Sequence, residues 1–68
     1  MSTSTTWTVT GMTCAHCEAS VREEVGEIPG VESVTADHTT GEVVVTSAEP
    51  VERSVVAAAV AEAGYELG

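Results

Sequence analysis

The spacing of apolar residues changes along this chain from the period of a strand to that of a helix and back, and this order restricts the folds open to it. Over Thr6–Thr10 apolar and polar residues alternate, with Trp7 and Val9 on one face and threonine on the other, which predicts a strand with one buried face. Over Ala15–Glu27 apolar residues instead recur at spacings of three and four, which predicts a helix. The Pro-Gly pair at 29–30 ends this helix.

The rest of the chain predicts a hairpin, followed by a second helix and a short last strand. Residues 31–45 contain two valine-rich stretches joined by a turn at Thr39–Gly41, which predicts a β-hairpin. A second helix is expected over Val51–Ala63, with Gly64 in the position of a C-cap, and Tyr65–Leu67 leaves room for a short last strand. The order βαββαβ predicts an α+β fold of the ferredoxin-like type, a sandwich in which two helices cover one face of a four-stranded antiparallel sheet.

Length and composition fit one small domain over residues 1–68. The segment Met1–Thr5 is rich in Ser and Thr and is interpreted as a loose N-terminal tail. The apolar residues include twelve valines and nine alanines but no phenylalanine, so the core consists of small side chains. Burial of such side chains provides only just enough stability for a fold of this size.

The net charge of −9 excludes some classes of partner. Eleven acidic residues face only Arg22 and Arg53, so the chain lacks the clustered cations that nucleic acid or an anionic membrane requires. The charge either keeps the protein soluble or forms an acidic face that docks on a basic partner. No stretch has the apolar length of a membrane span, the start lacks the features of a signal peptide, and two cysteines without a disulfide framework fit a reducing compartment. We therefore expect a cytoplasmic protein with no direct membrane insertion.

Cys14 and Cys17 carry the most specific chemistry in the chain. Cys14 ends the loop after the first strand and Cys17 begins the first helix, so both sulfurs can reach one point, where the N–H groups of a helix start favour thiolate. Glu18 in the same turn opposes this ionisation, and the pattern does not settle which effect is larger. Two thiolates select soft ions such as Cu(I) or Zn(II), but a structural zinc site takes four ligands, so the two-coordinate ion Cu(I) fits best. Such a site is open, and an incoming thiolate can exchange the metal to a partner.

The run GMTCAHC at Gly11–Cys17 resembles the GMTCxxC metal-binding motif of the heavy-metal-associated domain family, which comprises small copper chaperones and the N-terminal domains of copper-transporting P-type ATPases. The stretches GVESVTAD, EVVV and AEAGYEL follow in the family's order, so the likeness covers nearly the whole chain. The resemblance implies that Cys14 and Cys17 are Cu(I) ligands and that Met12 is a buried anchor under the loop.

Other residues near the cysteine pair are assigned roles by the same resemblance. It implies that Tyr65 shields or tunes the site, as is typical of bacterial members, and that Thr13, where zinc-handling members commonly have aspartate, favours copper. His16, between the cysteines, is either an auxiliary ligand or an exposed side chain. His38 stands where family members often have an inward leucine, and we interpret it as a hairpin-end residue at the sheet edge rather than a ligand.

The function implied by the resemblance is that of a cytosolic Cu(I) metallochaperone, not an enzyme, which transfers copper by thiolate exchange to the metal-binding domain of a P-type ATPase. It would be a monomer without metal, and a metal-bridged dimer is open to it because a neighbour's sulfur can add to the site. The alternatives are a domain of such an ATPase, a carrier of zinc or mercury, and a thiol-disulfide oxidoreductase. The chain is short for a thioredoxin-like oxidoreductase and lacks its cis-proline loop, since Pro29 and Pro50 lie at a helix end and a helix start.

Overall fold

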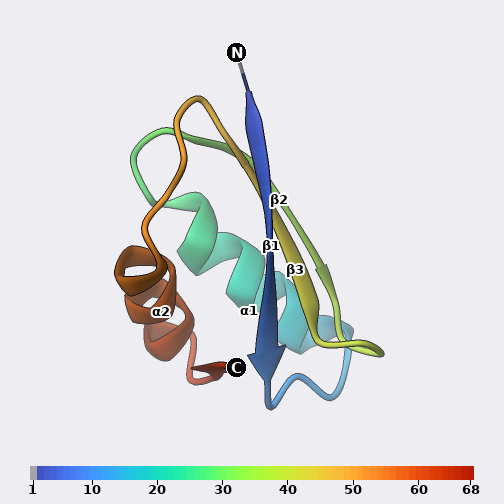
Figure 1. The fold of residues 1–68 in the computed structure, drawn as a ribbon. Coiled ribbons are helices and arrows are strands. Elements are labelled where there is room, and N and C mark those ends of the chain that lie inside the picture. Colours follow the sequence, from blue (N-terminus) through green and yellow to red (C-terminus); the bar gives the residue numbers. More distant parts are fainter. Residues whose placement is uncertain (1) are drawn as a thin grey trace.

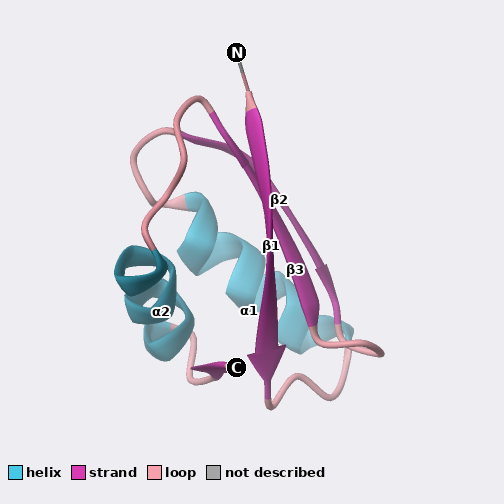
Figure 2. Cartoon of the chain, in the orientation of Figure 1, coloured by secondary structure: helices cyan, strands magenta, loops and turns pink. Residues whose placement is uncertain are grey.

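The computed structural model describes residues 2–68, and its elements follow the order predicted from the sequence (Figure 1, Figure 2). The strands and helices are β1 (Thr3–Thr10), α1 (Ala15–Gly26), β2 (Val31–Asp37), β3 (Glu42–Ser47), α2 (Arg53–Glu62) and β4 (Glu66–Leu67). Both predicted helices agree with the observed ones to within two residues at each end. Within residues 2–68, neither helix has the length and apolar content needed to cross a membrane.

The strands form one antiparallel sheet in the order β2-β3-β1-β4. Successive side chains of a strand point to opposite faces, so Trp7 and Val9 of β1 share a face with Val43 and Val45 of β3. This face packs on both helices, whereas the other face is exposed and carries Ser and Thr from β1. The predicted ferredoxin-like α+β fold is confirmed.

β1 begins at Thr3, three residues earlier than the sequence pattern indicates. The predicted loose tail over Met1–Thr5 is therefore wrong for Thr3–Thr5, and Met1 lies outside the described residues. The added residues continue the alternation and pair with β3, where Thr3 stands opposite Ser47. Threonine's β-branched side chain suits a half-buried strand, so a Ser/Thr-rich stretch that looks like a flexible tail extends the sheet instead.

The core lies between the sheet and the helices and consists almost wholly of valine. Among residues 2–68, the buried apolar residues are seven valines and one methionine: Val9, Met12, Val21, Val25, Val43, Val45, Val56 and Val60. Ser47 is buried among them, and its hydroxyl donates to the Glu49 carbonyl at 2.5 Å, so the polar group is satisfied. Because all but one of these side chains are valines, stability depends on close packing of small, stiff side chains.

The β1–α1 loop, the β2–β3 turn and the α2–β4 turn meet at one end of the sheet (Figure 1). Gly41 holds the β2–β3 turn against β1, because its carbonyl accepts the N–H of Val9 at 2.7 Å. The backbone of Gly41 has φ +78°, and a Cβ there would lie 2.8 Å from the Val9 carbonyl oxygen, so a side chain does not fit. This end of the molecule carries both cysteines.

Candidate metal centre

The loop that leads to the cysteines leaves β1 at Gly11, whose φ of +99° is favourable only for glycine. A Cβ on Gly11 would lie 3.1 Å from Cδ1 of Tyr65, so the glycine also lets the Tyr65 ring close against the loop. Met12 is only 8% exposed and packs into the valine core, in agreement with the role of a buried anchor. The loop is fixed by these two contacts, while Thr13 and Cys14 are exposed.

Cys14 is the N-cap residue of α1, with an extended backbone (φ −158°, ψ 174°). Its carbonyl accepts the N–H groups of Cys17 at 3.1 Å and Glu18 at 3.4 Å, which begins the helix. Cys17 lies in the first turn and is half-buried against the core, whereas Cys14 is exposed. The two thiols therefore share one helix start but differ in their access to solvent.

The sulfurs of Cys14 and Cys17 lie 3.5 Å apart, and both thiols are free. With metal–thiolate bonds of about 2.3 Å, near-linear coordination needs the sulfurs about 4.6 Å apart, so the pair must open by about 1 Å. Cys14 is the exposed member at the end of a loop, and a change in its side-chain torsion gives this opening while the helix stays in place. The pair is suited to take one ion from the solvent side.

The surroundings of Cys17 favour its thiolate. Hydrogen bonds, first from the backbone N–H of Thr13 and then from the Tyr65 hydroxyl and the Cys14 thiol, lower the pKa of Cys17 from 9.0 to about 6. The Thr13 hydroxyl adds a contact to the sulfur at 3.8 Å. The interaction with Cys17 in turn raises the pKa of Tyr65, because donating a hydrogen bond to the sulfur stabilises the protonated hydroxyl. Cys17 is therefore largely a thiolate at neutral pH.

We expect the alkylation rate of Cys17 in the metal-free protein to rise with pH through a midpoint near 6. The thiolate is the reactive form, so the rate is high above this midpoint and falls as the pH drops below it. Tyr65→Phe removes one hydrogen-bond donor and should move the midpoint upward, toward the ordinary value of 9.0. Site-resolved mass spectrometry after pulses of iodoacetamide measures both proteins, and identical midpoints would show that the Tyr65 hydroxyl has no effect on the thiol.

His16 lies in the first turn of α1 and is exposed to solvent. Among residues 2–68, its ring nitrogens do not gather with the sulfurs of Cys14 and Cys17 within 4.8 Å of one another. The geometry favours the interpretation of His16 as an exposed side chain over that of an auxiliary ligand.

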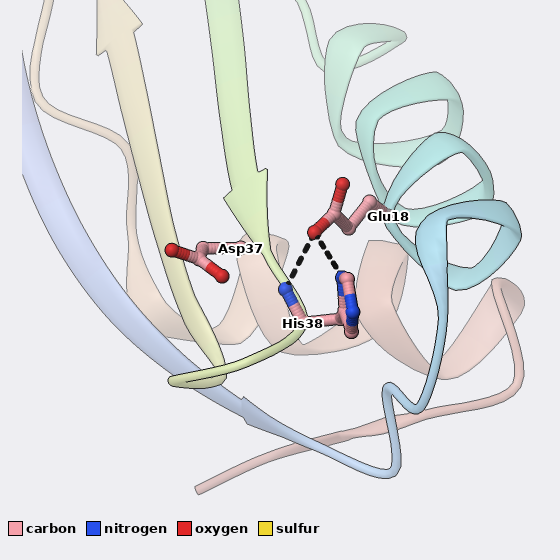
Figure 3. A group of neighbouring side chains, drawn as sticks. All are labelled: Glu18, Asp37 and His38. Carbon is pink, nitrogen blue, oxygen red and sulfur yellow. Dashed lines mark hydrogen bonds and ion pairs between the residues drawn. The ribbon is translucent and has the colours of Figure 1, made fainter.

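The sequence analysis missed a contact beside the cysteines, between Glu18 and His38 (Figure 3). Oε2 of Glu18 accepts the backbone N–H of His38 at 2.7 Å and lies 2.5 Å from Nδ1 of its ring. These hydrogen bonds, the backbone one first, lower the pKa of Glu18. The carboxylate therefore faces the β2–β3 turn, and the groups that shift the pKa of Cys17 do not include it. The thiolate of Cys17 is therefore favoured by Thr13, Tyr65 and Cys14, and neither the carboxylate nor the helix start is among the causes of its lowered pKa.

His38 is at the end of the hairpin, as predicted, but its side chain points toward α1 and not away from it (Figure 3). The alternation of β2 contains the signal for this, because Val34 and Ala36 are the half-buried residues of the strand and His38 continues their face.

Comparisons with known proteins agree with this fold and site. The Heavy-metal-associated domain family matches residues 6–66. The COP-associated protein of Helicobacter felis is 38% identical over 60 residues, which cover 88% of this chain and 91% of that protein. The copper chaperone CopZ of Bacillus subtilis is 37% identical over 60 residues, which cover 87% of each chain. A solved structure of a CopZ metallochaperone superposes with a TM-score of 0.89 at 28% identity and covers 97% of this chain and all of that one. The chain belongs to the heavy-metal-associated domain family.

Proposed function

We propose that this protein is a Cu(I) metallochaperone that binds one ion between the sulfurs of Cys14 and Cys17 and passes it to another protein. The observation that carries the proposal is the pair of free sulfurs 3.5 Å apart at an exposed helix start, with Cys17 held as thiolate by its neighbours. Thiolates are the soft ligands that Cu(I) prefers. The similarity to the copper chaperone CopZ of Bacillus subtilis supports copper as the metal.

The difference in exposure between the two cysteines favours an order for the transfer step. A thiolate of the partner adds to the bound ion from the solvent side as a third ligand. Cys14 then leaves first, because it is exposed, whereas Cys17 is half-buried and hydrogen-bonded to Thr13 and Tyr65. The ion passes between thiolates without being released to water. The receiving domain in this proposal is the metal-binding domain of a copper-transporting P-type ATPase, and the present chain acts as a single domain.

Anaerobic titration with Cu(I) in the presence of a competing chelator tests the proposal. We expect saturation at one Cu(I) per chain and no turnover of a disulfide substrate. A thiol-disulfide oxidoreductase would reduce or oxidise such a substrate at rates unaffected by Cu(I) chelators. A carrier of zinc would instead bind Zn(II) more tightly than Cu(I) in a parallel competition, and either result would replace the proposal.

The net charge of −9 leads to a prediction about the partner. If an acidic surface steers the encounter, the rate of copper transfer to a domain with a basic patch falls as salt rises, by about tenfold or more from low to physiological ionic strength. Stopped-flow measurement of the transfer at several salt concentrations gives this slope. Transfer to a small neutral chelator is the control and should change little with salt. A rate of transfer to the protein partner that does not change with salt would reject electrostatic steering, while the proposed metal binding would still stand.

A further inference from the structure

The position of Glu18 on α1 would ordinarily bring its carboxylate close to the cysteines. Glu18 follows Cys17 directly in the first turn of α1, about one turn along the helix from the N-cap residue Cys14. Long side chains on a helix point back toward its N-terminus, and the positive end of the helix attracts a carboxylate. Once a cation lies between the sulfurs, its charge adds to this attraction.

In the structure the carboxylate is held elsewhere, by two bonds from one residue of another element (Figure 3). Both the backbone N–H and the ring Nδ1 of His38 contact the same oxygen of Glu18, at 2.7 and 2.5 Å. A carboxylate only accepts hydrogen bonds, so Nδ1 carries a proton in this contact. The side chains are 19% exposed for Glu18 and 33% for His38, which limits competition from water.

The β2–β3 turn fixes the place of His38 independently of Glu18. The Asp37 carbonyl accepts the N–H of Gly41 at 2.8 Å, and Oδ1 of Asp37 accepts the N–H of Thr39 at 2.9 Å and its hydroxyl at 2.5 Å. Asp37 lies within 4.8 Å of the Glu18–His38 pair, but its carboxylate is engaged in this turn. His38 is thus held by a closed turn and can act as a fixed anchor for Glu18.

A free carboxylate beside two thiolates would change which ion the site prefers. Zn(II) takes four ligands and accepts carboxylate oxygen together with cysteine sulfur, whereas Cu(I) is selected by soft sulfur donors. An added oxygen donor therefore strengthens the binding of Zn(II) far more than that of Cu(I).

We propose that His38 is a specificity-determining residue, which holds the Glu18 carboxylate away from the Cys14–Cys17 pair and so keeps Zn(II) from gaining a third protein ligand. This inference rests on the proposed function. In this proposal His38 affects the choice of metal without being a ligand itself.

The test compares four proteins: the wild type, His38→Leu, Glu18→Gln and the double variant. Zn(II) affinity is measured by competition with a chromophoric chelator, and Cu(I) affinity anaerobically with a Cu(I) chelator. His38→Leu removes the imidazole bond and leaves only the backbone N–H of residue 38 on the carboxylate. We expect this variant to bind Zn(II) about tenfold more tightly, the lower end of the effect of groups that orient a ligand. Cu(I) affinity should change much less. The double variant should return to the Zn(II) affinity of Glu18→Gln alone.

The reversal by Glu18→Gln separates this role from a merely structural one. A structural loss would weaken the binding of both metals and would persist in the double variant. His38→Gln serves as the conservative variant, because its side-chain amide can donate to Glu18 and should keep Zn(II) affinity near that of the wild type. If His38→Leu unfolds, His38→Ala, which also removes the imidazole bond, takes its place in the comparison. Unchanged Zn(II) affinity in folded His38→Leu, or an increase that survives the loss of the carboxylate, would overturn the proposal. Failure of the wild type to bind Cu(I) would instead reject the proposed function, while the Zn(II) comparison would still decide the role of His38.

Discussion

Cys14→Ser and Cys17→Ser are each expected to lower the affinity for Cu(I) by more than about 100-fold, the upper range for loss of a group that only orients a ligand. Each variant leaves a single sulfur at the helix start, and a serine hydroxyl is a hard donor that Cu(I) disfavours. The sulfurs are 3.5 Å apart, and in the proposed site each of them provides one of the two ligands of Cu(I). Anaerobic competition titration of the three proteins against one Cu(I) chelator gives the affinities.

His16→Ala is the matched control for the cysteine variants, because it changes another metal-capable side chain of the same first turn. His16 is exposed, and we expect its removal to leave the Cu(I) affinity within about threefold of the wild type, a change of less than 1 kcal/mol. If His16→Ala costs as much affinity as Cys14→Ser, the histidine is a ligand and the two-sulfur account is wrong.

Val56→Ala is expected to destabilise the fold by about 2–3 kcal/mol, from the lost burial of two methyl groups and the cavity that they leave. Val56 is fully buried in α2, in a core that consists of seven valines and one methionine. A chain of 68 residues has a total stability of only about 3–10 kcal/mol, so this one change removes a large share of it. The melting temperature, followed by circular dichroism, should fall by roughly 8–24 °C.

Val55→Ala provides the control for this prediction, because it makes the same chemical change one position earlier in the same helix. Val55 is 40% exposed, and alanine has the higher helix propensity, so we expect a change within about 0.5 kcal/mol. Equal losses in the two variants would show that burial in the valine core does not set the effect.

Much of the fold follows from sequence because each element has its own local signal. The 3.6-residue period marks α1 and α2, and the Pro-Gly pair at 29–30 marks the end of the first helix. The start of β1 was predicted too late because Thr3–Thr5 have the composition of a flexible tail. Their place in the sheet comes from pairing with β3, 40 to 44 residues away, which no local pattern shows.

The cysteine pair could be predicted from the sequence, but the groups that surround it could be predicted only in part. The pattern gave two opposing effects on Cys17, a helix start and a neighbouring carboxylate, without their balance. The lowered pKa of Cys17 instead depends on Thr13, Tyr65 and Cys14, and of these Tyr65 is distant in the chain and reaches the site through the α2–β4 turn. His38 contacts Glu18 from the β2–β3 turn. The inward direction of His38 could have been inferred from the alternation of β2, whereas its contact with Glu18 depends on how closely α1 packs against that strand.

X-ray absorption at the copper edge tests the central claim most directly. The protein is loaded with less than one equivalent of Cu(I) and kept dilute, so that sulfurs from a second chain do not contribute. We predict that the copper is bonded to two sulfur atoms and to no nitrogen or oxygen, with Cu–S bonds shorter than the roughly 2.3 Å of a four-coordinate zinc–thiolate site. A first shell that contains a nitrogen or oxygen donor, or a third sulfur, would contradict a site made of Cys14 and Cys17 alone.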